Sequence, residues 1–363
     1  VREVGSIQAG FPDAESIQAA VRKGAAVEAG QLSRGMIAYG AILALQSPEY
    51  VTGVRQFASD PAQRQQMVSR IVADPAYAAT LPGALAAAPA RHWTGQALGA
   101  RASIRLDHPQ AEEITARCLT EIDRLENILS LYRADSALSR LNRSGRLDNP
   151  PFELLEILSL AGAVHHASGG AFDVTLQPLW ALWVEAAVQN RRPTRAERAA
   201  ALALGGWNDV ALSPQAITLR PGMALTLNGI GQGYVADRVA VLLEAEGLTN
   251  VLIDTGELRA LGERRWPVRI QNGDSLSLSA RALATSAPQA TCFDANGQDG
   301  HILDPRTGRP VVSPWTQVTV SAPSAALADA LSTAACLTTD WSQLDALVTS
   351  FNNVQVEAVQ PTF

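Results

Sequence analysis

After Trp93 the sequence alternates between short strand-like runs and helix-like segments, and this alternation constrains the fold more than any other feature. One long segment, residues 111–132, carries apolar side chains at helical spacing, including Ile114, Cys118 and Ile122. Strand-like runs occur at residues 96–109, 223–229, 250–262, 266–272, 281–287 and 315–322. Strands and helices interspersed in this way predict an α+β or α/β layered domain.

The first 90 residues differ from the rest because they are alanine-rich and helix-like throughout. Residues 13–30 begin with acidic residues suited to a helix start, and residues 60–75 place Asp and Pro at the start of a second helical pattern. The prolines and small residues of 81–93 are typical of a linker. A chain of 363 residues commonly forms two units. We therefore predict a helical accessory region at 1–90, for packing or docking, before a mixed domain at 91–363.

The composition excludes several classes of protein. A net charge of −6 argues against a nucleic-acid partner, which would require a basic face. Cys118, Cys292 and Cys336 have no C-x-x-C spacing, which argues against a zinc site or a disulfide framework. No apolar run reaches the ~18 residues of a membrane span. The first residues lack the apolar core of a signal peptide, but a mature chain whose leader has been removed would look the same, so export stays open.

Residues 225–247 (LTLNGIGQGYVADRVAVLLEAEG) join a strand-like run to a helix through three closely spaced glycines, Gly229, Gly231 and Gly233. Glycine lets a backbone approach a ligand closely, and the N–H groups at a helix start bind phosphate. The spacing matches neither the dinucleotide-binding nor the Walker pattern. Two interpretations stay open: a turn that binds an anion, and a turn whose glycines permit close packing.

Residues 321–337 (SAPSAALADALSTAACL) predict a helix that begins near Ser324 and carries three oxygen-bearing side chains on one face. Asp329, Ser332 and Thr333 stand at positions i, i+3 and i+4. One carboxylate with hydroxyls suits a hard cation such as Mg²⁺. The alternative is that the hydroxyls bond back to the preceding turn and that the aspartate faces solvent. Small apolar neighbours favour a partnered aspartate.

Two further segments place aromatic side chains near polar ones. In residues 169–183, Asp173 and Thr175 suit the polar edge of a ring, with tryptophans beside it. The alternative makes the tryptophans core residues and Asp173 a turn cap. In residues 128–142, Tyr132 follows a helix and either stacks on a flat cofactor or packs at the helix end.

Residues 301–310 (HILDPRTGRP) are too irregular for a helix and too rich in proline for a central strand. His301 has an ordinary pKa near neutrality and therefore suits proton transfer. It is equally suited to hydrogen bonding within the loop. Arg306 either contacts a phosphate or pairs with Asp304.

Together these segments resemble the ApbE family of FAD:protein FMN transferases, in the family's order and from Trp93 to about Leu347. The matching stretches are LSLYRADSALSRLN, GGAFDVTLQPLWALW, LNGIGQGYVADRV, NVLIDTGELRALG, ATSA, HILDPRTGRPV and VTVSAPSAALADALSTA. HILDPRTGRP followed by ADALST is the most specific pair. The form LNGIGQGY is similar to the branch linked to nitrous-oxide-reductase maturation. The region before Trp93 lies outside the resemblance.

The resemblance implies an ApbE-like (T-fold-like) α+β domain after the small helical region. Members bind FAD and Mg²⁺, cleave the FAD pyrophosphate, transfer FMN to a Thr or Ser of an acceptor flavoprotein, and release AMP. By motif, Asp329 and Thr333 would bind the metal with Ser332 adjacent and with the backbone carbonyl of Gly229. In the implied reaction Asp329 would be catalytic, and His301 is the candidate for proton transfer because of its ordinary pKa. FAD binding is implied for Leu98, Tyr132, Ala171, Phe172, Asp173, Thr226, Gln232 and Ile302. A periplasmic or cell-envelope location and a membrane-associated partner are also implied.

The chain departs from the family pattern at five places, all near the implied FAD site. Residues 98–100 read LGA where Met-Gly-Thr is usual, and residues 255–257 read TGE where Gly-Gly-Asp is usual. Thr226 and Gln232 stand where charged residues are common, and Ala287 ends the TSG element. These departures predict a divergent branch with altered FAD contacts, and the intact Asp329–Thr333 helix favours retained activity.

Three rival functions stay open. The protein could be a non-catalytic FAD-binding assembly factor or chaperone, because it has lost charged residues at the implied FAD site. It could be an FAD pyrophosphatase that yields FMN and AMP. In the third, residues 1–90 carry the main function as a docking module. The chain contains no Asp-Gly-x-Ser/Thr-Gly-Ala flavinylation sequence, which argues against self-modification by that route.

Overall fold

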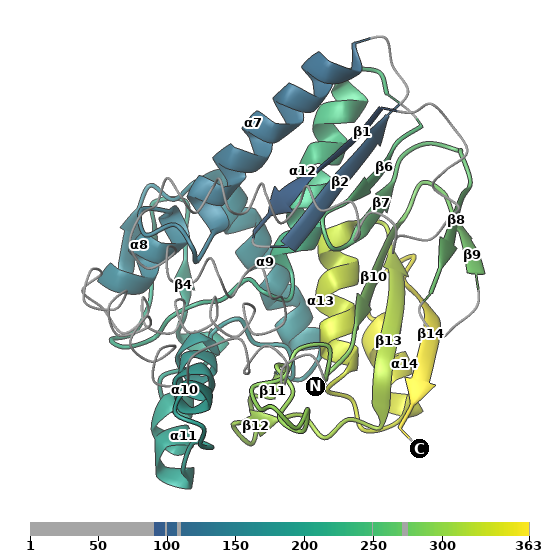
Figure 1. Ribbon diagram of the computed structural model, residues 1–363. Helices are drawn as coiled ribbons and strands as arrows, with labels where there is room; N and C mark the ends of the chain where they lie inside the picture. The colour runs from purple at the N-terminus through teal and green to yellow at the C-terminus, as the bar shows by residue number, and fades with distance from the viewer. Residues whose placement is uncertain (1–90, 99, 107–109, 249, 271–274, 363) are drawn as a thin grey trace, which may run out of the picture.

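The computed structural model describes residues 91–363, except residues 99, 107–109, 249, 271–274 and 363 (Figure 1). The helical region predicted at residues 1–90, which includes residues 81–90 of the predicted linker, lies outside the described residues and stays a prediction. Residues 91–93 were predicted as linker, but they form the start of a strand, because they pair with residues 104–106. Among the described helices, none combines the length and the apolar character needed to cross a membrane.

A seven-stranded antiparallel sheet organises the described chain, in the order β1-β2-β6-β7-β10-β13-β14. Its strands are β1 (Arg91–Ala97), β2 (Ala100–Leu106), β6 (Leu252–Asp254), β7 (Leu258–Ala260), β10 (Ala282–Ser286), β13 (Trp315–Ala322) and β14 (Gln355–Pro361). Strand β2 pairs with β6, and β7 pairs with β10, although long segments separate them in sequence. The sheet therefore brings distant parts of the chain together.

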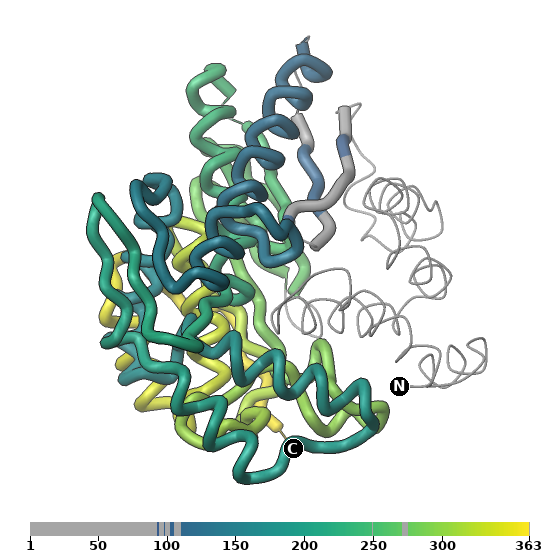
Figure 2. The backbone as a smooth tube through the Cα atoms, turned by 90° about the vertical axis from the view of Figure 1, so that its left-hand side faces the viewer, coloured from purple at the N-terminus to yellow at the C-terminus, as the bar shows by residue number. Residues whose placement is uncertain are grey.

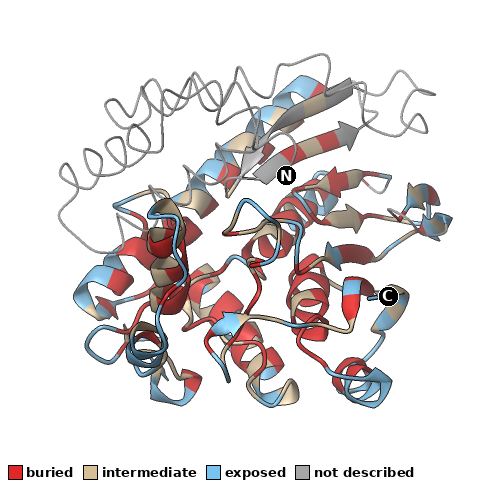
Figure 3. Cartoon of the chain, turned by 60° about the horizontal axis from the view of Figure 1, so that its bottom comes forward, coloured by how far each residue is buried: buried red, intermediate tan, exposed pale blue. Residues whose placement is uncertain are grey.

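Helices cover one face of this sheet. They are α7 (Ala111–Leu129), α12 (Gly231–Ala245) and α13 (Ala325–Ala335), with α9 (Phe152–Ala167) packed outside them against α7 and α13. Figure 2 shows α7 and α12 side by side, and Figure 3 shows that the helix surfaces facing the sheet are buried. The predicted apolar stripe of α7 is confirmed, because Ile114, Cys118 and Ile122 are all buried. The layered α+β prediction is thus confirmed.

Smaller elements surround the layers. Helix α8 (Ala137–Ser144) leads into a three-stranded sheet in the order β3-β5-β4, and two hairpins, β8–β9 and β11–β12, project from the body. The remaining bounds are β3 (Arg146–Asp148), α10 (Gln177–Val188), α11 (Arg195–Leu202), η2 (Trp207–Asp209), β4 (Ala211–Leu212), β5 (Ala216–Thr218), β8 (Trp266–Arg269), β9 (Ser275–Leu278), β11 (Leu303–Asp304), β12 (Arg309–Pro310) and α14 (Trp341–Thr349).

Helix α13 lies at the centre of the molecule, and its small residues explain how it fits there. Every residue of α13 except Thr333 is buried. A Cβ built on Gly233 of α12 would lie only 2.2 Å from the carbonyl oxygen of Ala325. The carboxylate of Asp237 accepts hydrogen bonds of 2.8 Å from the backbone N–H groups of Ala325 and Ala326. At Gly233, therefore, the glycine permits close packing, and the first turn of α13 is capped by α12.

One predicted strand is wrong. Residues 223–229 form no strand, and only Ala224 makes an isolated bridge, to Leu176. The reason is local. The side chain of Asn142 donates to the carbonyl of Leu225 at 2.9 Å and accepts from its N–H at 2.7 Å. An amide side chain thus satisfies the backbone groups that a neighbouring strand would otherwise bind.

Residues 301–310 contain a very short hairpin. Leu303 pairs with Pro310 and Asp304 with Arg309, so each strand has two residues. Gly308 closes the turn with a φ of +66°, a conformation that glycine adopts without strain. The segment is therefore more regular than its prolines suggest.

Candidate active site

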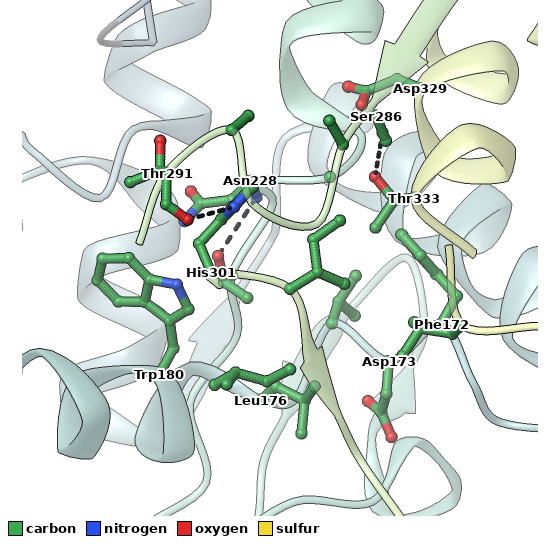
Figure 4. A pocket seen from close by; sticks show the side chains of 18 of the residues that line it. Phe172, Asp173, Leu176, Trp180, Asn228, Ser286, Thr291, His301, Asp329 and Thr333 are labelled. Atoms are coloured by element: carbon green, nitrogen blue, oxygen red, sulfur yellow. Dashed lines mark hydrogen bonds between the residues drawn. The ribbon is translucent and has the colours of Figure 1, made fainter. Parts of the chain in front are cut away.

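A cavity of about 290 Å³ opens where α13, the start of α12, the end of β10 and the loop at residues 287–302 meet (Figure 4). Ten of the predicted site residues line it: Ala171, Phe172, Asp173, Thr226, Gly229, Gln232, His301, Ile302, Asp329 and Thr333. The fold thus brings residues that are up to about 160 positions apart in the sequence into one cavity. Asp329 and Thr333 lie on one side of it, and Trp180, Thr291 and His301 on the other.

We call Glu257, Asp329 and Thr333 the carboxylate side of the cavity. Thr333 is the one residue of α13 that is not fully buried, and its hydroxyl lies 3.2 Å from that of Ser286 on β10. A Cβ built on Gly229 would lie 3.2 Å from the Thr333 hydroxyl, so the loop before α12 runs close against this side chain. Two predicted ligand sources, Gly229 and Thr333, are therefore neighbours.

Asp329 is only 4% exposed, although it carries a carboxylate. Its Oδ2 accepts one long hydrogen bond of 3.3 Å, from the N–H of Gly233 in the first turn of α12. Burial raises the pKa of Asp329 to about 7, the Gly233 N–H opposes the shift, and the negative charge of Asp237 adds to it. A buried carboxylate with so few donors favours a cation in the cavity.

The donors on this side fit a hard cation. The carboxylate of Asp329, the hydroxyl of Thr333 and the adjoining Gly229 backbone all offer oxygen, which Mg²⁺ and similar ions prefer. In the described part of the chain, no three His, Cys, Asp or Glu side chains gather as they would at a metal centre built from such ligands alone. A cation here would need hydroxyl, carbonyl or substrate oxygens as further ligands.

Ser332 does not line the cavity, unlike its neighbour Thr333. Its side chain is fully buried, donates to the carbonyl of Asp329 at 3.0 Å and lies 2.7 Å from the hydroxyl of Ser286. The alternative of a hydroxyl bonded back to its own helix therefore describes Ser332. In this position it ties α13 to β10 behind the cavity.

Glu257 is a cavity residue that sequence reasoning did not single out. It is 8% exposed, lines the cavity, and lies in the turn between β6 and β7. Burial raises the pKa of Glu257 well above its ordinary value, and the negative charge of Asp329 raises it further, while the Thr285 backbone N–H opposes the shift. The only signal in the sequence was the departure TGE, and nothing in that motif places it beside α13.

His301 lines the opposite side and is held by the loop at residues 287–302. Its Nδ1 lies 3.1 Å from the carbonyl oxygen of Thr291, and its backbone N–H donates to the same oxygen at 3.0 Å. Because a carbonyl only accepts, Nδ1 carries the proton and Nε2 is the acceptor of the neutral ring. Burial lowers the pKa of His301, and the backbone carbonyls of Thr291 and Pro288 oppose the shift. The histidine is therefore neutral and tied to the loop.

Asp173 lines the cavity, but its carboxylate makes local bonds and points away from Asp329 (Figure 4). Its Oδ1 accepts from the N–H and the hydroxyl of Thr175, at 2.8 and 2.6 Å. The fully buried Thr175 hydroxyl in turn accepts from Gly206 at 2.7 Å. The turn-cap interpretation thus describes Asp173, and Thr175 belongs to the structure behind it.

The two tryptophans of residues 169–183 have different roles. Trp183 is a core residue whose indole N–H donates to the carbonyl of Gly308 at 2.9 Å. Trp180 lines the cavity beside His301 and meets Phe293 edge-on, with ring centroids 5.9 Å apart. We call Trp180, Thr291 and His301 the histidine side. The two interpretations of these tryptophans thus divide between them, because Trp183 is a core residue and Trp180 also reaches the cavity.

Leu98 and Tyr132 line a smaller adjoining cavity of about 40 Å³. Asn228 and Gln232 line both cavities and so connect them. Leu98 has a φ of +50°, which is rare for leucine, and its N–H donates to Glu126 at 2.9 Å. The structure therefore brings these two predicted residues near the others, but into a separate recess.

The charges around the main cavity are unusual for a phosphate site. Its lining residues, all within the described chain, include no lysine or arginine. Arg306 instead pairs with Asp304, with Nε–Oδ1 2.8 Å, and donates to the carbonyl of Leu337 at 3.1 Å. The open question about Arg306 is resolved in favour of this ion pair. A polyanion in the cavity would need a cation from solution.

The fold and the cavity define a layered α+β protein with an oxygen-lined site opposite a half-buried histidine. The model of the ApbE family matches residues 98–357. The chain belongs to the ApbE family, which confirms the resemblance.

Relatives support this assignment. The FAD:protein FMN transferase of Escherichia coli K12 is 29% identical over 259 residues, covering 64% of this chain and 73% of that protein. The protein of the same name from Vibrio cholerae O395 is 30% identical over 267 residues, covering 67% and 79%.

Solved structures of ApbE proteins have folds similar to that of this chain. The apo flavinyl transferase ApbE of Pseudomonas stutzeri has a TM-score of 0.64 at 27% identity, covering 71% of this chain and 87% of that one. The ApbE protein of Thermotoga maritima has a TM-score of 0.65 at 25% identity, covering 75% and 97%. The predicted fold class is thereby confirmed.

Proposed function

We propose that this protein is an FAD:protein FMN transferase. It cleaves the pyrophosphate of FAD, transfers FMN to a Ser or Thr hydroxyl of an acceptor flavoprotein, and releases AMP. Family membership and the curated relatives of that name support the proposal. The observation that carries it is one cavity with Asp329 and Thr333 on one side and a neutral His301 on the other (Figure 4).

We further propose Mg²⁺ as the cation of the site. Asp329, Thr333 and the carbonyl of Gly229 would hold it, and bound Mg²⁺ would neutralise phosphate charge as the pyrophosphate is cleaved. The lack of lysine and arginine along the cavity supports this, because nothing else on the described lining offsets the charge of FAD. The hydroxyl of Ser332 contacts that of Ser286 and so helps to hold α13 against β10 behind these ligands.

His301 is the proposed base. The acceptor hydroxyl oxygen attacks the FMN phosphorus, the P–O bond to AMP breaks, and AMP leaves with the bridging oxygen. The hydroxyl proton moves to Nε2 of His301, because Nδ1 is committed to Thr291. The lowered pKa keeps this nitrogen unprotonated at neutral pH.

The FAD contacts are proposed to be altered in this branch. Thr226 and Gln232 both line the main cavity, so uncharged side chains stand where the resemblance implied charged ones. Gln232 also borders the recess of Leu98 and Tyr132. Hydrogen bonds from these two residues would replace charged contacts to the nucleotide. A periplasmic or cell-envelope location with a membrane-associated acceptor remains the proposal from the resemblance, and cell fractionation with detection of the FMN adduct tests it.

Incubation of the full chain with FAD and Mg²⁺, followed by separation of the nucleotides, tests the activity and its rivals. With an acceptor peptide that carries the Asp-Gly-x-Thr-Gly-Ala sequence, AMP and flavinylated peptide are expected in equal amounts. AMP with free FMN and no adduct would identify a pyrophosphatase instead. Tight FAD binding without AMP would identify a non-catalytic assembly factor.

A further inference from the structure

Glu257 is a buried carboxylate in the cavity to which the proposed reaction gives no role. It faces the same cavity as Asp329, and the two side chains are 8% and 4% exposed. Two buried like charges without a cation nearby are unfavourable, and the lining supplies no lysine or arginine. A divalent cation between them would offset both charges.

The turn that carries Glu257 is held in place on both sides. The hydroxyl of Thr255 donates to the carbonyl of Gln232 at the start of α12, at 2.8 Å. Gly256 has a φ of +99°, a conformation that favours glycine, and its N–H donates to Asp254 at 3.0 Å. The N–H of Thr255 donates to the carbonyl of Glu257 at 3.1 Å. The backbone of Glu257 is therefore fixed before any ligand arrives.

The pairing of β7 with β10 explains why the Glu257 side chain turns toward the cavity. The ladder joins Ala282 to Arg259 and Leu283 to Leu258, and it stops there. Beyond it, the Thr285 backbone lies close enough to the Glu257 carboxylate to favour its charged form. A carboxylate has two oxygens and several acceptor positions, so this contact leaves capacity for a cation.

We infer that Glu257 is a second carboxylate of the cation site, and that it sets the affinity of the cavity for a divalent ion together with Asp329. The inference rests on the proposed function in that it takes Asp329 as a cation ligand. Glu257 either contacts the ion or orders a water bound to it, and in both cases its charge increases affinity.

Calorimetric titration of Mn²⁺ into the full, metal-free chain, without FAD or acceptor, tests the inference. Glu257→Gln keeps the size of the side chain and an acceptor for the Thr285 N–H but removes the charge. It is expected to weaken Mn²⁺ binding about 10- to 100-fold, and Asp329→Asn is expected to weaken it further. Glu244→Gln removes an exposed glutamate of α12 and is the matched control, with unchanged affinity. Wild-type affinity in Glu257→Gln would overturn the inference.

Thermal unfolding adds a readout that a merely structural role would not produce. Without metal, Glu257→Gln is expected to unfold at the wild-type temperature or above it, because a buried carboxyl group that is costly to ionise beside Asp329 is gone. Added Mn²⁺ should then raise its unfolding temperature less than that of the wild type. A lower unfolding temperature with an undiminished Mn²⁺ shift would contradict the inference. Glu257→Asp retracts the charge by one methylene and should bind Mn²⁺ more weakly than the wild type, and undiminished binding would also count against it.

The failure of this inference and the failure of the proposed function are distinguishable. Mn²⁺ binding that depends on Glu257, in a chain that never releases AMP from FAD, would remove the function and leave the inference. Metal-dependent AMP release, with the same Mn²⁺ affinity in Glu257→Gln and the wild type, would remove the inference and leave the function.

Discussion

The carboxylate side and the histidine side of the cavity differ in how the fold holds them. Asp329 and Thr333 belong to α13, whose first turn is capped by Asp237 and which packs directly on α12 at Gly233. His301 and Thr291 belong to a loop outside the sheet, and Trp180 to a helix outside the central layers. The core thus fixes one side, and peripheral elements supply the other.

This difference fits a division of labour. The buried carboxylate side suits a task that needs fixed geometry, such as holding a cation against a pyrophosphate. The histidine side, made of a loop and an aromatic ring, suits contact with a protein acceptor that varies in shape. Four single substitutions test whether the two sides have these separate tasks.

Asp329→Asn is expected to have the largest effect. It removes the charge that would bind the cation, and metal ions contribute several kcal/mol to such steps, so FMN transfer should fall about 10³-fold or more. The metal-free variant should be no less stable than the wild type, because a buried and poorly partnered charge is lost. AMP release and urea unfolding measure the two outcomes. Full transfer by a folded, metal-supplied variant would rule out the assigned role.

His301→Gln is expected to slow transfer about 10²-fold, because it removes the base but not the cation ligands. Mn²⁺ affinity should be unchanged, which separates the two sides. The lowered pKa of His301 also sets the pH dependence. A base works unprotonated, so the part of the acid-side decline that comes from His301 should have its midpoint below the ordinary histidine pKa. Protonation of Asp329, whose pKa is about 7 without a metal, also slows transfer, so the decline is compared in saturating Mg²⁺. An acid-side decline that is identical in His301→Gln would contradict the role of His301.

Gly233→Ala tests the rigidity of the carboxylate side. The new Cβ would meet the Ala325 carbonyl at 2.2 Å and would push α12 from α13, at a cost of about 2 kcal/mol in the free energy of unfolding. Mn²⁺ binding should weaken because Asp329 shifts with α13. Gly247→Ala is the control, since its Cβ would meet nothing within 4 Å. It strains a φ of +77° and should lower stability while leaving Mn²⁺ binding intact. Equal Mn²⁺ affinity in both variants would show that the helix contact does not position the site.

Trp180→Ala tests the histidine side and should have the smallest effect. Loss of an aromatic surface beside His301 is expected to raise the KM for an acceptor peptide about tenfold, with little change in the KM for FAD. Trp341→Ala, at an exposed tryptophan of α14 outside the cavity, is the control. If the KM for FAD rises and that for the peptide does not, Trp180 belongs to the nucleotide site instead.

The two sides also differ in how far the sequence predicted them. Helix α13 was recognisable because Ser324 caps it and because Asp329 interrupts a run of small residues. His301 stood out as a titratable group in a rigid segment. Their placement in one cavity could be expected only from the family resemblance, since α13 and the loop are separate elements.

Other residues were beyond sequence reasoning for physical reasons. Glu257 reaches the cavity only because β7 pairs with β10 and lies against α12. Trp180 and Trp183 both pack against Phe293, and only the tertiary structure shows that Trp180 also lines the cavity. The predicted strand at residues 223–229 failed because the Asn142 side chain takes the place of a neighbouring strand. In all three cases, contacts between residues that are distant in the sequence determined the observed structure.

We expect a cation bound at Asp329 to enable FMN transfer across this cavity. Mass spectrometry tests this on an acceptor peptide that has been incubated with the full chain and FAD, once with Mg²⁺ and once with a chelator. The expected result is a peptide heavier by one FMN moiety with Mg²⁺, and unmodified peptide with the chelator or with Asp329→Asn. Equal modification with and without the metal, or by Asp329→Asn, would contradict the claim.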